Sequence, residues 1–307
     1  MASNLASRLP IRRFRVLLCV ATISALTALG TVSCSSPATP EPATPETVTP
    51  ETVAPESSNT PSDSSGPCAI KPSAENTGAA GQLQNNSTTV LNNSQTLENV
   101  RVKDLEIQGN GVTLRNVVAE SILITGNDAM LDHVSSTGIS ISSAANATVQ
   151  FSNIGNTKGD GIHITSDGER MVRNVVLRHN FIHTPKVPES AHYDGTQVRG
   201  VRKLVISCST YDPGPYRDPF NAAIYIEDAN GGNTKVSIVH NWLYGFGFSV
   251  MIDSSKTRII GNRVGGDIHW DTCDLGDSVR VSSLKIRDNI NDETHEPEPM
   301  CSQASKR

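Results

Sequence analysis

Aromatic residues are scarce in this 307-residue chain, and several kinds of functional motif are missing from it. Only 4% of the residues are Phe, Trp or Tyr, and the chain has no Walker-type or dinucleotide glycine loop, no HExxH and no paired CxxC. These absences argue against the nucleotide and zinc sites that such motifs build. A basic excess is also missing, because 26 Lys and Arg stand against 31 Asp and Glu. We therefore expect no nucleic-acid partner, since phosphate recognition needs a basic surface.

Residues 1–33 have the pattern of an export signal. A basic stretch at Arg8–Arg15 precedes an uncharged run, Val16–Val32, which is short for a membrane span and ends in small residues before Cys34. The last four residues up to Cys34 resemble a bacterial lipobox, which implies lipidation of this cysteine and anchoring to the cell membrane. Ordinary cleavage followed by secretion, or retention of an uncleaved anchor, are the alternatives.

Residues 34–66 differ sharply in composition from the rest of the chain. They hold seven prolines, many Ser and Thr, and the repeat TPETV-TPETV-APE, so there is almost nothing to bury. Such a segment stays extended and solvated. We interpret it as a disordered linker that carries a folded domain spanning residues 67–307.

Two series of short apolar segments alternate through the folded domain. Segments of the first series contain a polar or bend-forming residue, and nine such positions recur at intervals of 17 to 33 residues: Asn99, Asn116, His133, Asn153, Asn180, Cys208, Asn241, Asn262 and Asn289. Segments of the second series lie between them, at 121–125, 138–142, 161–165, 195–199, 223–227, 249–253 and 267–271. Asn tolerates the left-handed bend conformation and can bond to the Asn of a neighbouring repeat.

This organisation predicts an all-β fold, a single-stranded right-handed parallel β-helix (solenoid) of about nine coils. One coil cannot bury its own apolar residues, so stacked coils build the core, and the hand follows from the general chirality of parallel crossovers. A two-sheet sandwich also has strands at short spacing. It does not explain two series in strict alternation.

The domain resembles the pectate-lyase-like right-handed β-helix superfamily over residues 81–290. Within that group, His192 with Asp194-Gly195-Thr196-Gln197 resembles an HxDGxQ signature of uncharacterised secreted actinobacterial β-helix proteins, and Asn221–Ile224 and His240–Leu243 fit the later coils. The resemblance implies polysaccharide lyases, hydrolases or epimerases, but also tailspikes and adhesins. Motifs of the characterised branches, such as Gly-His-Gly and Asp-Pro-His-Asp, are absent.

Strand alternation predicts which side chains of the second series point inward or outward. The inward set is Ile162, Ile164, Thr196, Val198, Ile224, Ile226, Val250, Ile252, Ile268 and Trp270. The outward set forms two ladders, one of Leu123, Ser140, His163, Gln197, Tyr225, Met251 and His269, the other of Thr125, Ser142, Thr165, Arg199, Glu227, Asp253 and Asp271.

The outward face becomes polar and titratable from the fourth coil onward, which predicts a polysaccharide site. Asp194, Asp160, His192 and Arg199 are the candidate catalytic residues, because two close carboxylates divide acid and base roles and His or Arg can serve a lyase. His163, Gln197, Tyr225 and His269 are the candidate substrate ligands. Each Asp-Gly pair is also typical of a simple turn.

Three carboxylates of the second ladder would repel one another unless a cation bridges them. Glu227, Asp253 and Asp271 are therefore the candidate ligands of a calcium ion. Loops at Thr184–Ala191 and Ser209–Asn221 could wall a groove, and ten of the thirteen aromatic residues lie between Tyr193 and Trp270.

Four cysteines remain after the signal and Cys34. Cys68, Cys208, Cys273 and Cys301 predict two disulfides in an exported protein, with three pairings open. Cys68 and Cys301 flank the domain and could secure its ends, whereas Cys208 and Cys273 are expected on loops.

Two functions are compatible with these features. The first is a cell-surface lipoprotein, expected to be a monomer, that binds and processes a polysaccharide as a glycoside hydrolase or polysaccharide lyase. The second is a non-catalytic glycan-binding, adhesin or structural surface protein.

Overall fold

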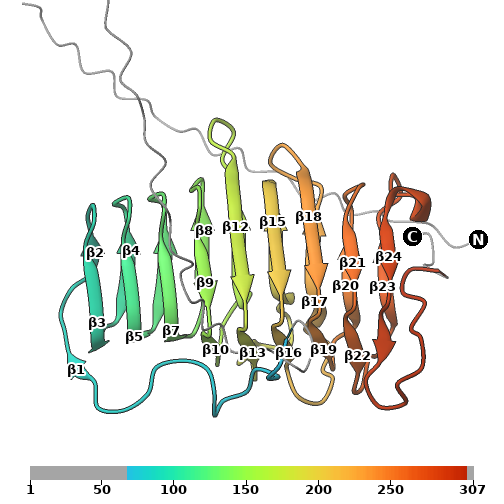
Figure 1. The fold of residues 1–307 in the computed structure, drawn as a ribbon, viewed down its shortest axis with the longest axis horizontal. Coiled ribbons are helices and arrows are strands. Elements are labelled where there is room, and N and C mark those ends of the chain that lie inside the picture. The colour runs from blue at the N-terminus through green and yellow to red at the C-terminus, as the bar shows by residue number, and fades with distance from the viewer. Residues whose placement is uncertain (1–67, 303–307) are drawn as a thin grey trace, which may run out of the picture. The chain divides into compact units, whose positions relative to one another are not determined.

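A computed structural model describes residues 68–302 (Figure 1). The export signal, Cys34 and the whole linker lie outside these residues. Among the described residues, no helix is long and apolar enough to cross a membrane. The only helical element among them is a 3-10 turn, η1 (Val281–Ser283).

The described chain is a parallel β-solenoid whose coils are stacked one against the next, as the prediction required. Two sheets run along the stack, and Figure 1 shows their strands side by side in chain order. The nine strands of the first, called sheet B, match the expected number of coils; they are β2 (Val90–Leu91), β4 (Asp104–Ile107), β6 (Ser121–Ile124), β8 (Ile139–Ser142), β11 (Ile162–Thr165), β14 (Tyr193–Arg199), β17 (Phe220–Glu227), β20 (Phe248–Ile252) and β23 (Asp271–Leu275).

The second sheet, called sheet A, has 16 strands and bends sharply along its length. Its early strands run through the bend, and from the fourth coil each is split into two. The strands are β1 (Gln84–Asn85), β3 (Thr96–Arg101), β5 (Thr113–Ala119), β7 (Met130–Ser136), β9 (Thr148–Gln150), β10 (Asn153–Gly155), β12 (Val172–Arg178), β13 (Phe181–His183), β15 (Val201–Ser207), β16 (Thr210–Asp212), β18 (Asn233–Val239), β19 (Trp242–Tyr244), β21 (Arg258–Ile260), β22 (Arg263–Gly265), β24 (Lys285–Arg287) and β25 (Ile290–Asn291).

The bend of sheet A is made by one left-handed residue in each coil. These residues are Asn99, Asn116, His133, Phe151, His179, Cys208, His240, Gly261 and Asp288. The prediction was correct for the first three and for Cys208, and Asn116 Nδ2 donates to Asn99 Oδ1 at 2.8 Å. In the other coils the bend lies before the expected residue: one residue before Asn180, Asn241, Asn262 and Asn289, and two before Asn153.

The residue that follows each bend points inward, which explains the difference. Val occupies this place in the first three coils, and Ser152, Asn180, Ser209, Asn241, Asn262 and Asn289 occupy it afterwards. Asn241 Oδ1 accepts from the backbone N–H of Ser209 at 3.0 Å, and Asn262 Oδ1 accepts from that of Asn241 at 3.0 Å. Buried amides thus join successive coils where backbone groups would otherwise lack partners.

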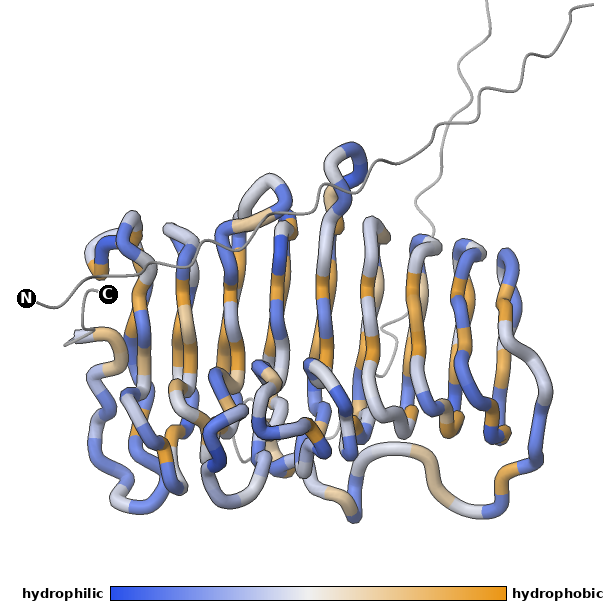
Figure 2. Tube along the Cα trace, turned by 180° about the vertical axis from the view of Figure 1, so that it is seen from behind, coloured by the Kyte–Doolittle hydropathy of each residue, from blue (hydrophilic) through white to orange (hydrophobic). Residues whose placement is uncertain are grey.

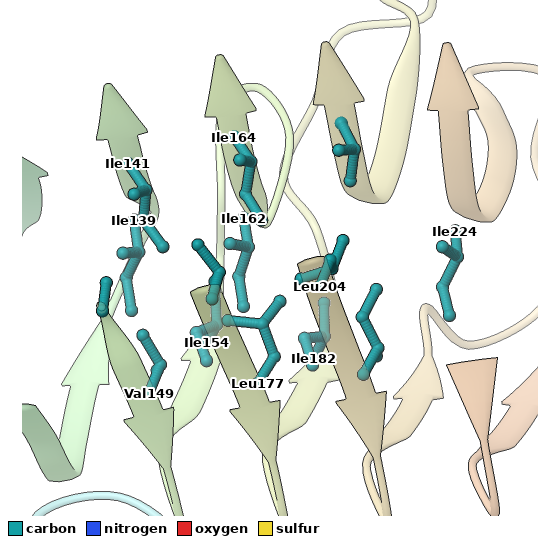
Figure 3. Close-up of a cluster of buried hydrophobic side chains, with 14 of the residues drawn as sticks. Ile139, Ile141, Val149, Ile154, Ile162, Ile164, Leu177, Ile182, Leu204 and Ile224 are labelled. Atoms are coloured by element: carbon teal, nitrogen blue, oxygen red, sulfur yellow. The ribbon is translucent and has the colours of Figure 1, made fainter. Parts of the chain in front are cut away.

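Alternating apolar residues from both sheets fill the interior of the solenoid. Figure 2 shows the hydrophobic stretches aligned between neighbouring coils, and Figure 3 shows Ile139 and Ile141 beside Ile162 and Ile164, with Leu177 facing them from sheet A. These five side chains are buried. Burying each one is worth about 1.5–3 kcal/mol relative to exposure, which holds the coils together.

The last coil departs from the predicted register. Strand β23 is 271–275 rather than 267–271, and Cys273 and Leu275 pair with Val250 and Ile252. Cys273 and Leu275 therefore point inward, while Trp270 is exposed and Ile268 only partly buried. Both segments alternate apolar residues in the same way, so the pattern could not choose between them.

Two disulfides secure the described chain. They join Cys68 to Cys208 and Cys273 to Cys301. Cys68 and Cys301 lie near the two ends of the described chain, as expected. Cys208 lies in the short bend between β15 and β16, and Cys273 is buried within β23 rather than on a loop. Two disulfides are typical of proteins exported to an oxidising compartment.

Candidate functional site

Asp160 and Asp194 occupy equivalent places at the start of neighbouring strands of sheet B. Ile162 in β11 pairs with Thr196 in β14, which sets the two carboxylates one coil apart as predicted. The Asp194-Gly195 pair is not a turn, because both residues lie within β14, whereas Gly161 lies at a bend directly before β11. A Cβ atom on Gly195 would come within 2.6 Å of Ala223 O, so glycine is needed there for the coils to approach.

Asp194 is completely buried and is held by donors from the next coil. Its Oδ1 accepts from Asn221 Nδ2 at 2.8 Å and from the backbone N–H of Ala222 at 3.0 Å. Asn221 reaches this carboxylate because β17 has one extra residue opposite the Tyr193–Asp194 step of β14, a β-bulge. The remaining oxygen, Oδ2, lies 3.2 Å from His192 Nε2.

His192 is the accessible member of this pair. Its side chain is 58% exposed, whereas that of Asp194 is 0% exposed. The pKa of His192 is raised, chiefly by its close contact with the Asp194 carboxylate and further by the charges of Asp160 and Glu227. Burial raises the pKa of Asp194, against the opposing effects of its His192 and Asn221 hydrogen bonds.

A second histidine–carboxylate pair is joined to the first. His163 Nδ1 lies 3.1 Å from Asp160 Oδ2. Asp160 Oδ1 accepts from the backbone N–H of Asp194 at 3.0 Å, so the two pairs share one hydrogen-bonded chain. Three of the four candidate catalytic residues, Asp160, His192 and Asp194, therefore gather with the candidate substrate ligand His163 in what we call the His–Asp cluster (Asp160, His163, His192 and Asp194). The fourth candidate, Arg199, contacts Glu227 instead.

The outward ladders continue from this cluster across β14, β17 and β20. His163, Gln197, Tyr225 and Met251 are successive register partners, as predicted. Gln197 Nε2 donates to Glu227 Oε2 at 3.2 Å, and Arg199 Nε lies 3.0 Å from the same oxygen. Glu227 is therefore engaged by Arg199.

Two predicted ladder residues are absent from this face because of the register of the last coil. Asp274, not His269, lies next to Met251. Gly276, not Asp271, lies against Asp253, so the expected trio of Glu227, Asp253 and Asp271 is not assembled. Asp253 instead accepts a hydrogen bond from the Tyr225 hydroxyl at 2.9 Å. No group of three or more potential ligands that could hold a metal ion occurs among residues 68–302.

A groove with a volume of about 480 Å³ ends at Asp160. It follows the starts of β4, β6 and β8, in the early coils, where no polar site was expected. Its charged lining is Asp104, Glu120, Lys158 and Asp160.

Of the two predicted wall loops, the one at Ser209–Asn221 is shorter than expected, since β16 takes up Thr210–Asp212. They touch each other where Arg217 donates to Val187 O at 3.4 Å.

Comparisons with known proteins do not identify the function of this site. No family model matches the chain, and no curated protein matches it either. Among solved structures the chain is similar to a GH136 lacto-N-biosidase from Eubacterium ramulus, at 9% identity and a TM-score of 0.24. The match covers 73% of this chain and 45% of that one, so the chain spans less than half of that protein. A likeness this weak carries no information about activity.

Sequence reasoning missed two further features of this face. Asn221 stood in a quoted motif, but nothing in the sequence signalled the bulge that aims its amide at Asp194. Trp270 was assigned to the core, yet its ring is half exposed beside Tyr216 and His269. The glycine and polar residues on both sides of Trp270 were the signal in the sequence that this side chain could lie at the surface.

Proposed function

We propose that this protein binds a polysaccharide on sheet B and cleaves it with the His–Asp cluster. The observation that supports this most is the exposed His192 backed by the fully buried carboxylate of Asp194. Such a carboxylate orients the imidazole and favours its charged form, which suits it to proton transfer. In this proposal Asp194 is a positioning residue, because a buried group cannot touch a glycan.

The proposed reaction is hydrolysis of a neutral glycan. Protonated His192 would donate its proton to the leaving glycosidic oxygen, and Asp160 would take a proton from the attacking water. The surroundings favour a neutral substrate over an anionic one, since three carboxylates and one lysine line the groove. Arg199, which could neutralise a uronate, is already paired with Glu227.

A glycan screen with the full-length protein tests this proposal. We expect new reducing ends from a neutral glycan without ultraviolet-absorbing products, and at least about a hundredfold lower rate for His192→Gln, the usual contribution of acid–base catalysis. An unsaturated uronate product would instead identify a lyase. Asn174→Ala is a suitable control, because Asn174 is exposed on sheet A.

The alternative is a non-catalytic glycan-binding or surface protein. It is favoured by the hydrogen bonds that tie Asp160 and Asp194 into the backbone of adjacent coils, since such bonds also serve stability alone. Glycan binding without any cleavage, unaffected by His192→Gln, would establish it.

We also propose that the protein is exported and anchored by a lipid on Cys34. The lipobox-like sequence supports the anchor, and the two disulfides support export. Cys34→Ala should move the protein from the detergent-requiring membrane fraction into an aqueous one.

A further inference from the structure

An exposed tryptophan stands at the start of the last strand of sheet B. Trp270 is 50% exposed, whereas Trp242, the other tryptophan of the chain, is 9% exposed. The indole lies directly over Gly247, where a Cβ atom would meet the ring at 2.3 Å. The backbone N–H of Trp270 also donates to Gly247 O at 2.9 Å, so backbone contacts fix the position of the ring.

Other rings surround this tryptophan and hold its orientation. Phe248, at the start of β20, packs on the indole with ring centroids 5.0 Å apart. Tyr216 meets the indole edge-on at 5.9 Å and stacks flat on His269 at 4.0 Å, with planes 7° apart. Tyr216 comes from the loop between β16 and β17, so two segments distant in sequence build one aromatic surface.

This aromatic surface lies on the same edge of sheet B as the His–Asp cluster. Asp194 pairs with Ala222, Ala222 with Phe248, and Phe248 with Asp271, the residue after Trp270. Strands β14, β17, β20 and β23 are thus successive neighbours (Figure 1). Three strand spacings amount to about 14 Å, a distance that a short oligosaccharide can span.

The chemistry of the surface suits a neutral sugar ring. Flat, preoriented aromatic faces pack against the C–H faces of a pyranose, and their cost in conformational entropy is low because neighbours already hold them. Asp218, Asp267 and Asp271 lie within two residues of these rings in the chain, against one cation, Arg217, so the charge near the rings is negative and disfavours an anionic ligand. A cluster of three rings is also small for a protein interface.

We infer that Trp270, with Tyr216 and His269, is a stacking subsite for a neutral pyranose of a glycan that extends to the His–Asp cluster. This inference rests on the proposed function for the identity of the ligand. In this inference His269 contacts the glycan by stacking, although it does not lie on the outward ladder where it was predicted. Trp270, which strand alternation placed in the core, becomes a sugar-binding residue.

Tryptophan fluorescence tests the subsite directly. The full-length protein is titrated with the hexasaccharides and disaccharides of cellulose, chitin, xylan and mannan. We expect a fluorescence change with a hexasaccharide that persists in Trp242→Phe and vanishes in Trp270→Phe. A response to none of these glycans, or one that depends on Trp242, would overturn the inference.

Chain length separates the subsite from a general effect on folding. Trp270→Ala should weaken hexasaccharide binding by at least about tenfold, while far-ultraviolet circular dichroism stays unchanged. Disaccharide binding at the cluster should be unaffected. Ile70→Ala is the matched control, since Ile70 is the most exposed large apolar side chain among the described residues and lies near Cys68. Equal hexasaccharide affinity of Trp270→Ala and the unmodified protein would overturn the subsite.

The two proposals fail separately. Trp270-dependent binding without cleavage would leave the subsite standing and remove the catalytic proposal. Cleavage whose KM and rate are both unchanged in Trp270→Ala would support the catalytic proposal and remove the subsite. His192→Gln should abolish cleavage and keep the fluorescence response.

Discussion

At the scale of single residues, Asp194 carries the largest electrostatic cost in the site. A carboxylate without any exposed surface must obtain all its stabilisation from protein groups, and Asp194 has two fixed donors on Oδ1 and His192 near Oδ2. The donors on Oδ1 serve the fold, since they are present whatever the state of His192. The contact with His192 links Asp194 to an exposed side chain, which is the member of the pair that a substrate can reach.

Substitution of Asp194 should separate these two roles. Asn keeps an acceptor for Ala222 N–H and Asn221, so Asp194→Asn should remain folded, yet it removes the charge that favours protonated His192. We expect at least about a hundredfold loss of glycan cleavage. Asp194→Ala leaves two buried donors unpaired and should lower the free energy of unfolding by about 1–3 kcal/mol for each. Full activity of Asp194→Asn, measured beside its thermal melt, would assign Asp194 to stability alone.

The raised pKa of His192 makes a prediction about pH. A group whose pKa is higher in the folded protein stabilises it fully below the unfolded value, here 6.5, and that contribution is lost as the pH rises through the folded pKa. Asp194 acts in the same sense, because burial raises its pKa above the ordinary value of 3.8. The stability advantage over His192→Gln should therefore shrink as the pH is raised above 6.5 in urea titrations. A constant difference would contradict the pairing.

At the scale of elements, two kinds of polar ladder run along the stack of coils. Exposed ladders such as Asn174 Nδ2 to Asn146 Oδ1, at 2.8 Å, lie in water and compete with it. The buried ladder at Ser152, Asn180, Ser209, Asn241, Asn262 and Asn289 does not. Hydrogen bonds in the interior lose more when one partner is removed, because water cannot replace it.

Replacing one asparagine of each ladder should measure this difference. Asn241→Ala leaves Ser209 N–H and Ile206 O without their partners, which should cost about 1–3 kcal/mol for each group. The matched change Asn174→Ala should stay within about 0.5 kcal/mol, as is usual on a surface. Equal losses for the two variants in urea unfolding would refute a special role for the buried ladder.

At the scale of the whole described molecule, the N-terminal segment from Cys68 to β1 lies along the bends and joins distant coils. It begins at the disulfide to Cys208, Gly78 N–H donates to Phe151 O at 2.7 Å, and Ala80 N–H donates to Asn116 Oδ1 at 2.7 Å. Figure 1 shows it as the blue-to-cyan stretch along the lower edge. A solenoid otherwise has contacts only between neighbouring coils, so this segment adds long-range cooperativity.

The two disulfides should therefore contribute unequally. They close loops with sequence separations of 140 and 28 residues. Removing either should lower the free energy of unfolding by about 2–5 kcal/mol, and the entropy of the longer loop adds about 1.4 kcal/mol to the effect. Paired Cys→Ser changes at 68 and 208, compared with 273 and 301 in urea unfolding, check this. A larger loss for the shorter loop would show that the N-terminal segment adds little.

Much of this architecture was present in the sequence because strand alternation is local. Residues two apart share a face, so Ile162 and Ile164 had to be core and His163 had to point out, whatever surrounds them. The same periodicity placed Asp160 and Asp194 at equivalent points of adjacent coils. The solenoid and most of the His–Asp cluster follow from that rule alone.

The tertiary structure decided what depends on competition between equally good local patterns. Residues 267–271 and 271–275 alternate alike, and pairing with β20 selected the second, which moved His269 and Asp271 off the ladders and exposed Trp270. The bulge at Asn221, the burial of Asp194 and the disulfide pairing are likewise relations between distant segments. No local rule contains them, because their free energy arises only when the coils are stacked.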